Sequence, residues 1–464
     1  MPFFVRYRAR QNYLRNSPRC PPQHFYSEHI MKNPFTAAIA ASKSTGIEVI
    51  EAEGLIKWQG DLGGNVKPDG PLRGKRIGVI IASEFSDFQV YYLASYIGEM
   101  GGICDFLLVD WVTWKNTRPN VPGKGVRGMW DLGVDPIPVM GGNKNQHWTC
   151  LKDAKVADYD VLIIPGGHSA DVMVTEPDVI NFVEQAHATD VILATIGAGS
   201  MPLIRAGAMH GKRCTGDRAV KFMLQKIARF EEVPVVVDGD LLTARSTADT
   251  PALLRALCAL VDTEYEDDWK NALKGKRVLI PATDDFEDIE LVVPVMELLY
   301  RGAEVIIGHF EAELRARPGL LGSETITGNF GVTIPFQEIP DSFYTYKPLN
   351  DVRMSDFDVL VITGAFNPWN MVMTGQADWL QEANTAGKIL SAICHGPIPL
   401  AEAGLVSGRH LTGWEASRDS VEIMGGSFDC NEAAALVDGR IVTGRTPAEI
   451  PEFIDAISVA LLRE

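Results

Sequence analysis

Residues 391–397 read Ser-Ala-Ile-Cys-His-Gly-Pro, and this stretch decides the fold of the chain. The run before it, Lys-Ile-Leu-Ser-Ala-Ile at 388–393, predicts a buried strand. The run after it, 398–404, predicts a short helix closed by glycine. Cys394 therefore falls on a sharp turn from strand to helix, the geometry that exposes the nucleophile of many hydrolases.

The residues around Cys394 fit a reactive thiol. Ala392 and Gly396, two residues before and two after, are small, as a crowded turn requires. Free N–H groups at a helix start favour the thiolate, so the expected pKa is roughly 3.5 to 7.5 instead of about 8.5. The competing interpretation is an inert core cysteine, which explains neither the small residues nor His395.

The bulk composition bounds the class of protein. The chain has 464 residues, 46% apolar and 22% charged, which is typical of a globular protein with two domains. A net charge of −17 argues against a nucleic-acid partner, and no apolar run is long enough for a membrane span. The seven cysteines are scattered without a metal-binding pattern, so we expect no metal and a reducing, cytoplasmic compartment.

The N-terminal segment leaves two interpretations open. Residues 1–30 hold five arginines and one acid, Glu28, a composition typical of an organellar transit peptide. Alternatively, Met31 is the true first residue and the upstream segment is an extension. We expect one or two helical turns at 34–41 and a glycine-rich linker at 60–74.

The chain contains an internal repeat with an offset of about 200 residues. Strands that alternate with helices predict a parallel, doubly wound sheet in each repeat. The matching stretches are 74–81 with 275–280, 158–167 with 356–365, and 194–199 with 391–396, together with Phe85 and Phe286, and Asp87 and Asp288. The predicted divisions are an N-terminal extension and linker (1–73), a first domain (74–262), an acidic linker (263–273) and a second domain (274–464).

Each repeat carries a long insertion, at about 111–155 and 311–354. Insertions of this length are usually hairpins or lids. Their aromatic residues could line a pocket or pack the insertion itself. These residues are Trp111, Trp114, Trp130, Trp148, Phe330, Phe336, Phe343 and Tyr344.

The stretch Ala-Ile-Cys-His-Gly-Pro at 392–397 resembles the signature of the ThiJ/PfpI family. The resemblance covers nearly all of 274–464 and, more weakly, 74–262, so the chain resembles a tandem member with a degenerate first half. It implies a flavodoxin-like, class I glutamine amidotransferase-like α/β/α sandwich with a mostly parallel sheet in each half. Members of that family include glyoxalases that need no cofactor, reported deglycases, isocyanide hydratases and proteins described as intracellular peptidases.

The resemblance also places an active-site glutamate at Glu290, on the helix after the first strand of the second half. A carboxyl group beside the thiol can hydrogen-bond the sulfur and act as an acid or a base. Its neighbours Glu287 and Asp288 are interpreted as surface acids. The first half lacks these reactive groups, because it has Gln89, Gly197 and Ala198 at the positions of Glu290, Cys394 and His395.

His395 is the base in the peptidase-like and glyoxalase-like branches, and it needs a third group to orient it. In the PfpI-like branch this group is a carboxylate from the partner subunit, four residues after the Gly-Gly turn. The matching residue is Asp171 in the first half and Trp369 in the second. We expect Asp171 to reach His395 if the halves pair as an intramolecular pseudo-dimer. The alternative is that Asp171 only caps the helix that follows it.

A bound oxygen would lie against the N–H of His395 and an N–H of the Gly364-Ala365 turn, close to Gly396. The family usually has Gly-Gly at this turn, as in 166–167 of the first half. An alanine fits there only if its φ stays negative.

These residues favour a cysteine-dependent enzyme, without a cofactor, that acts on a small electrophilic carbonyl compound. The first hypothesis is a glyoxalase, which converts an α-oxoaldehyde to a hydroxy acid. The alternatives are a hydratase or hydrolase of another small electrophile, similar to isocyanide hydratase, and a PfpI-type cysteine peptidase. A non-catalytic alternative is a redox sensor or chaperone-like protein in which Cys394 is oxidised to sulfinate beside Glu290. We expect a small-molecule substrate and neither nucleic acid nor membrane as partners, while further copies of the chain could associate.

Overall fold

The computed structural model describes residues 48–52, 54–60, 69–111, 126–129, 133–134, 146–313 and 325–463. The hypotheses for residues 1–30 and 34–41, and the side chains of Trp114 and Trp130, lie outside these residues. Within the described residues, no helix is long and apolar enough to cross a membrane.

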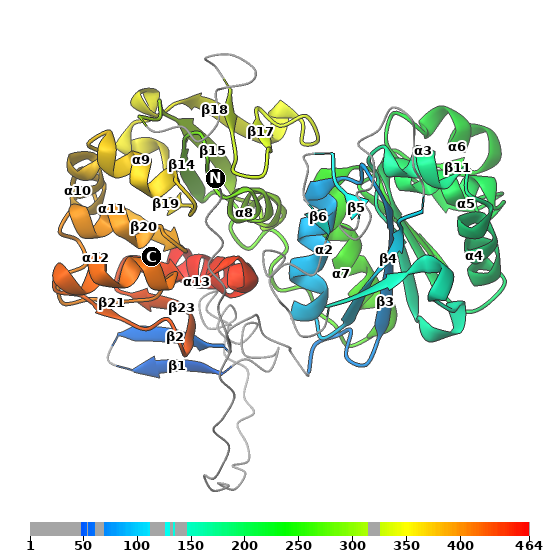
Figure 1. Ribbon diagram of the computed structural model, residues 1–464, viewed down its shortest axis with the longest axis horizontal. Helices are drawn as coiled ribbons and strands as arrows, with labels where there is room; N and C mark the ends of the chain where they lie inside the picture. The colour runs from blue at the N-terminus through cyan, green and yellow to red at the C-terminus, as the bar shows by residue number, and fades with distance from the viewer. Residues whose placement is uncertain are drawn as a thin grey trace, which may run out of the picture. The chain divides into compact units, whose positions relative to one another are not determined.

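The first half is built on a seven-stranded sheet (Figure 1). The strands lie in the order β12-β13-β9-β8-β3-β4-β7, and all neighbours are parallel except β12 and β13. Apolar runs such as Ile-Gly-Val-Ile-Ile in β3 suit a sheet that is covered on both faces. The strands are β3 (Arg76–Ala82), β4 (Ile103–Val109), β7 (Gln146–Cys150), β8 (Val161–Ile164), β9 (Ile192–Ile196), β12 (Val235–Asp238) and β13 (Leu241–Ala244).

The second half repeats this sheet and extends it to nine strands, in the order β1-β2-β23-β24-β20-β19-β14-β15-β18. The six strands from β24 to β18 are parallel neighbours, and the edge from β1 to β24 is antiparallel. The strands from its own part of the chain are β14 (Arg277–Ala282), β15 (Glu304–His309), β18 (Tyr344–Pro348), β19 (Val359–Ile362), β20 (Ile389–Ile393), β23 (Ala433–Asp438) and β24 (Ile441–Gly444).

The other two strands, β1 (Val49–Ala52) and β2 (Leu55–Gln59), precede the first half in sequence but pair with the second. Lys57 Nζ lies 2.8 Å from Asp429 Oδ2, and Arg445 Nη2 donates to the carbonyl oxygen of Gly60 at 2.8 Å. The sequence predicts only an extension and linker here, because two strands this short carry little pattern of their own.

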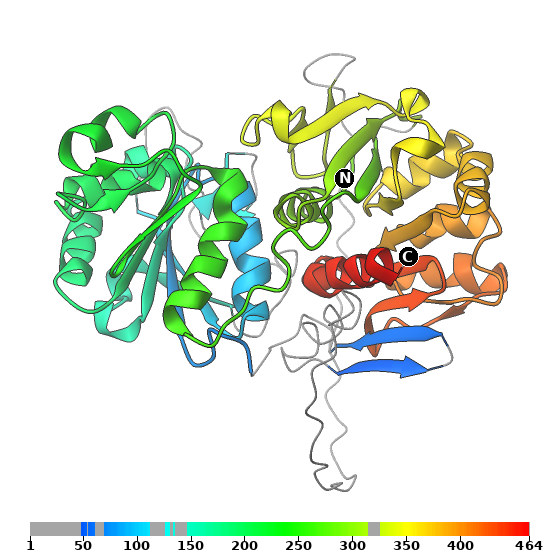
Figure 2. The same ribbon diagram turned by 180° about the vertical axis from the view of Figure 1, so that it is seen from behind.

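Helices cover both faces of each sheet (Figures 1 and 2). In the first half α2 and α7 pack on one face and α3 to α6 on the other, and in the second half α8 and α13 oppose α9 to α12. The predicted class, two tandem flavodoxin-like α/β/α domains with mostly parallel sheets, is confirmed. The helices are α2 (Asp87–Glu99), α3 (Ser169–Met173), α4 (Pro177–His187), α5 (Met201–Arg205), α6 (Lys221–Ile227), α7 (Thr250–Val261), α8 (Asp288–Tyr300), α9 (Asn367–Met373), α10 (Ala377–Thr385), α11 (Pro397–Glu402), α12 (Arg418–Ile423) and α13 (Ile450–Arg463).

One hydrophobic core contains buried residues of α2, α7, α8 and α13, and so draws on both halves. A polar network lies buried within it. Tyr92 of α2 donates to Glu297 of α8 at 2.6 Å, and Arg255 of α7 donates to the same carboxylate at 2.6 Å. Buried charges persist only when they are paired and hydrogen-bonded in this way.

The aromatic residues of the insertions that can be placed in the structure mostly pack. Trp148 stacks on Phe106 of β4 with a centroid distance of 4.7 Å. Phe336, from the insertion of the second half, meets Phe88 of α2 edge to face at 5.2 Å. These side chains therefore serve in packing, and the contact of Phe336 with Phe88 links the two halves.

Candidate active site

β20 delivers Cys394 to a strained turn. Cys394 has a φ of +60°, a conformation that costs about 1–2 kcal/mol for a residue other than glycine. Its N–H donates to the carbonyl oxygen of Gly444 at 3.1 Å. A Cβ on Gly396 would lie 2.7 Å from the carbonyl oxygen of Ile362, so only glycine fits there. Strain of this kind is typical of functional sites, and here it sets the thiol at the carboxyl edge of the sheet.

His395 stands beside the thiol, with Nδ1 3.2 Å from Cys394 Sγ. In an ordinary strand, the side chains of two neighbouring residues point to opposite faces of the sheet. The left-handed backbone at Cys394 instead brings its side chain and that of His395 together. Burial lowers the pKa of His395. The imidazole is therefore neutral at neutral pH, and its contact with sulfur suits a base.

Glu290 is fully buried on the first turn of α8. Its Oε2 accepts the N–H of Gly364 at 2.5 Å, whereas Oε1 has no hydrogen-bond partner of ordinary geometry among the described residues. Burial raises its pKa to about 8, against the opposing effects of Gly364 and of the Cys394 thiol. A carboxyl group that stays protonated at neutral pH beside a thiol can serve as an acid.

The interpretation of Glu287 and Asp288 as surface acids is wrong. Glu287 caps α8, accepting the N–H of Glu290 at 2.7 Å, and is 6% exposed, while Asp288 is fully buried. Asp288 accepts the N–H groups of Phe330 and Val332 at 2.8 and 2.7 Å and so anchors the insertion. Burial raises the pKa of Glu287 well above its usual range. No group of described residues is arranged to hold a metal ion.

The expected low pKa of the Cys394 thiol is also corrected. Burial and the nearby Glu290 and Glu287 carboxyls raise it well above the usual value, and only the N–H of His395 lowers it. The helix that follows, α11, is six residues long, so its dipole is weak against the loss of water. The thiol therefore needs an adjacent base to become a nucleophile.

The Gly364-Ala365 turn, which we call the oxyanion turn, departs from the prediction in two respects. Ala365 has a φ of +53°, although a negative φ was expected, because its bridge to Phe286 places it where the first half has Gly167. The N–H of Gly364 is committed to Glu290 and is not available to a substrate oxygen. The backbone N–H of His395 is hydrogen-bonded to the sulfur of Cys394.

The structure does not bring Asp171 to His395. Asp171 lies on α3 of the first half with an exposed side chain, and among the described residues no hydrogen bond or ion pair joins it to His395. Of the four residues predicted to be catalytic, the structure thus brings together Cys394, His395 and Glu290.

Comparison with known proteins agrees with this architecture. The model of the DJ-1/PfpI family matches residues 75–260 and again 276–460. The chain belongs to the DJ-1/PfpI family. A DJ-1 homolog D of Arabidopsis thaliana is 26% identical over 318 residues, which is 67% of this chain and 79% of that protein. A deglycase of Pyrococcus abyssi is 30% identical over 38% of this chain and 92% of its own length. A Bacillus subtilis protein whose name suggests a cysteine protease is 31% identical over 39% and 94%.

We call the strand-to-helix turn at Cys394, and the matching turn at Gly197 in the first half of this DJ-1/PfpI chain, the elbow of each half. The elbow of the first half is already filled by a side chain. Gly197 has a φ of +53°, close to that of Cys394. Oδ2 of Asp217 lies 2.5 Å from the point where a Cβ on Gly197 would stand. The same carboxylate accepts the N–H of Ala198, the counterpart of His395. A carboxylate thus occupies the place of the missing thiol.

The insertion of the second half reaches this filled elbow. Gln89, the counterpart of Glu290, donates to Thr247 at 2.8 Å, and Thr247 donates to Glu338 of the insertion at 3.2 Å. Ser86 also donates to Glu338. Sequence reasoning missed Asp217 and Glu338, because neither belongs to the motif. Aligning the two halves residue by residue would have placed Asp217 opposite Trp414.

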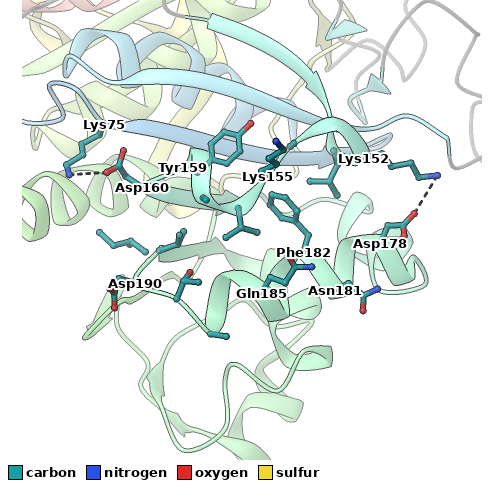
Figure 3. Close-up of a pocket in the computed structure, with 18 of the residues that line it drawn as sticks. Lys75, Lys152, Lys155, Tyr159, Asp160, Asp178, Asn181, Phe182, Gln185 and Asp190 are labelled. Atoms are coloured by element: carbon teal, nitrogen blue, oxygen red, sulfur yellow. Dashed lines mark hydrogen bonds and ion pairs between the residues drawn. The ribbon is translucent and has the colours of Figure 1, made fainter.

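A cavity of about 1140 Å³ in this DJ-1/PfpI chain lies away from the thiol (Figure 3). Tyr159 and Phe182 form part of its wall in the first half. Lys75 and Asp160, which pair at 3.1 Å, directly precede β3 and β8, so the cavity lies at the starts of the parallel strands. Ligands of open α/β sheets bind beyond the opposite, carboxyl ends, and we give the cavity no catalytic role.

Proposed function

We propose that the second half is a cysteine-dependent enzyme that converts an α-oxoaldehyde into a 2-hydroxy acid. The observation that supports this most directly is the setting of the thiol between two groups with opposite tasks. His395 lies 3.2 Å from the sulfur as a neutral base, and Glu290, with a pKa of about 8, is a protonated acid. Environments that push two pKa values in opposite directions are how enzymes assign acid and base roles.

In the first step His395 takes the thiol proton while sulfur bonds to the aldehyde carbon. The electron pair of the C=O bond moves to its oxygen, and Glu290 protonates that oxygen. We assign the stabilisation of the developing charge to the N–H of His395, because it is hydrogen-bonded to the attacking sulfur. The result is a hemithioacetal with an ionised Glu290 and a cationic His395.

In the second step Glu290 removes the hydrogen of the same carbon as a proton, and the cationic His395 protonates the neighbouring ketone oxygen. Glu290 then returns its proton to the former ketone carbon while His395 takes the hydroxyl proton, which leaves a thioester. Water cleaves the C–S bond and releases the hydroxy acid and the thiol. One carbon is oxidised while its neighbour is reduced, so the balance needs only water.

A panel of substrates tests this reaction. The protein is incubated with α-oxoaldehydes, isocyanides and an unfolded peptide, and products and protein mass are measured together. We expect hydroxy acid from the oxoaldehydes, no product from Cys394→Ser, and full activity from Cys150→Ser, a half-exposed thiol in the first half. Turnover of isocyanide or peptide alone would replace the proposed reaction. Cys394 that gains two oxygen atoms and turns over nothing would favour the redox sensor, which needs no base at His395.

A further inference from the structure

Three large aromatic residues with exposed side chains lie on the backbone segments that surround Cys394. Phe366 is 42%, Trp369 40% and Trp414 46% exposed, whereas Cys394 is 8% exposed. Exposed aromatic residues in one place are uncommon on a protein surface and mark binding sites more often than chance. We call these three residues the aromatic rim.

The position of Trp414 at the mouth of the elbow follows from its backbone and from the repeat. Its N–H donates to the carbonyl oxygen of Cys394 at 2.8 Å. Its counterpart in the first half is Asp217, because Thr215 and Thr412 make the same pair of hydrogen bonds two residues earlier in each half. The side chain of Asp217 reaches into the elbow itself, so a side chain at this position can approach the reactive atom.

Phe366 and Trp369 follow the oxyanion turn. The N–H of Phe366 donates to the carbonyl oxygen of Asp285 at 3.0 Å, two residues after Gly364. Trp369 is one turn further along α9, on the same side as Phe366, and the two residues between them are buried. Their counterparts in the first half are the polar residues His168 and Asp171.

The two halves thus differ in a consistent way around the elbow. All three positions are polar in the half without a thiol and aromatic in the half with one. If the aromatic side chains served only the packing of the fold, they would be buried, as Phe85 and Phe286 are at another matched pair of positions. The difference follows the chemistry and not the fold.

We infer that the aromatic rim selects a substrate whose electrophilic carbonyl group carries an aromatic or bulky apolar substituent. The inference rests on the proposed function, in which the thiol attacks an aldehyde carbon. With that carbon at Sγ, the remainder of an aryl oxoaldehyde extends over the rim, where rings stack and exclude water. A methyl substituent is too small to reach it.

The first experiment compares kcat/KM for phenylglyoxal and methylglyoxal. We expect the wild type to favour phenylglyoxal by roughly tenfold or more, which corresponds to one or two aromatic contacts. Trp414→Ala and Trp369→Ala, which remove the rings without adding a charged group near the thiol, should lose that preference and keep their turnover of methylglyoxal. Trp414→Phe should retain most of it. Phe222→Ala, at an aromatic residue of α6 that is 66% exposed in the first half, is the matched control and should behave as wild type.

A second readout separates the rim from the reaction. The rates at which 2-bromoacetophenone and bromoacetone alkylate Cys394 are measured by mass spectrometry, which requires no turnover. Faster labelling by the aryl reagent that depends on Trp414 and Trp369, without turnover of any oxoaldehyde, would support the rim and overturn the proposed reaction. Equal or better use of the methyl compounds in both assays would overturn the rim alone. A change in solution mass of Trp369→Ala or Trp414→Ala, without a change in selectivity, would show instead that the rim joins copies of the chain.

Discussion

Gly364 donates its N–H to Glu290 Oε2 at 2.5 Å and lies against both that carboxyl group and the thiol of Cys394. A Cβ at this glycine would lie 2.7 Å from Glu290 Oε2 and 3.1 Å from Cys394 Sγ. Glycine is therefore required here because there is no room for a Cβ atom, and not because the backbone has a positive φ. The carboxyl group of Glu290, the thiol of Cys394 and the turn therefore meet at this glycine.

This contact makes Gly364→Ala a sensitive test of the site. The added methyl group must push the acid away from the thiol, so we expect kcat to fall by about 10²-fold or more while stability falls by only about 1–3 kcal/mol. Gly404→Ala is the control, because its φ of +70° carries strain but its surroundings are open. Steady-state kinetics and urea denaturation separate the two effects, and an equal loss of kcat in both variants would contradict the assignment.

Glu290→Gln should separate the reactivity of the thiol from turnover. The ionised carboxylate raises the pKa of Cys394, so a neutral amide should lower that pKa and speed the alkylation of Cys394 at pH values above about 8. Turnover should fall by roughly 10²–10⁴-fold, because the acid is lost. Glu304→Gln, on an exposed residue of β15, should change neither. Slower alkylation in Glu290→Gln would show that the carboxylate supports the thiolate.

The pH dependence of kcat follows from the two shifted groups. Glu290 acts as an acid only while protonated, and its raised pKa keeps it so up to about 8, above which activity should decline. His395 acts as a base only while neutral, and its lowered pKa should preserve activity below the usual histidine value of about 6.5. A pH profile of kcat at saturating substrate checks both limits. If activity were instead lost on acidification near pH 6.5, the side chain of His395 would have to be exposed to solvent, with an ordinary pKa.

Asp171→Asn decides between the hypothesis from the sequence and the structure. A carboxylate that orients the catalytic histidine is worth up to about 10⁴-fold in kcat. Because the side chain of Asp171 is exposed and makes no contact with His395, we expect kcat to change less than about twofold. A large loss of kcat with unchanged melting would show that Asp171 reaches His395 after all, in another arrangement or from a second copy.

Gly197→Cys should not create a second active site. Its Cβ would meet Oδ2 of Asp217 at 2.5 Å, so we expect a loss of stability of about 1–3 kcal/mol and no activity in a Cys394→Ser background. The double variant Gly197→Cys, Asp217→Trp relieves the contact and is the control for stability. Because Gln89 and Ala198 remain, activity in either variant would contradict the assigned roles of Glu290 and His395.

Local patterns made much of the fold and the elbow predictable. The strand, the small neighbours and the glycine around Cys394 are one continuous stretch, and the repeat shows which positions the first half has lost. The pKa of the thiol depends instead on carboxyl groups that lie about 100 residues away in sequence and become buried only in the fold. The left-handed backbone at Ala365 depends on its bridge to Phe286, which no local pattern announces.

The attachment of β1 and β2 to β23 makes the second half a discontinuous domain. The whole first half is inserted between its first two strands and the remainder, and the strand that β2 needs as its neighbour is among the last to be synthesised. A chain growing from its N-terminus must therefore hold β1 and β2 unpaired while the first half folds. Any fragment that begins at residue 274 leaves β23 as an open edge, which is a template for aggregation. The second half can be truncated at the boundary of the repeat only by giving up part of its own sheet.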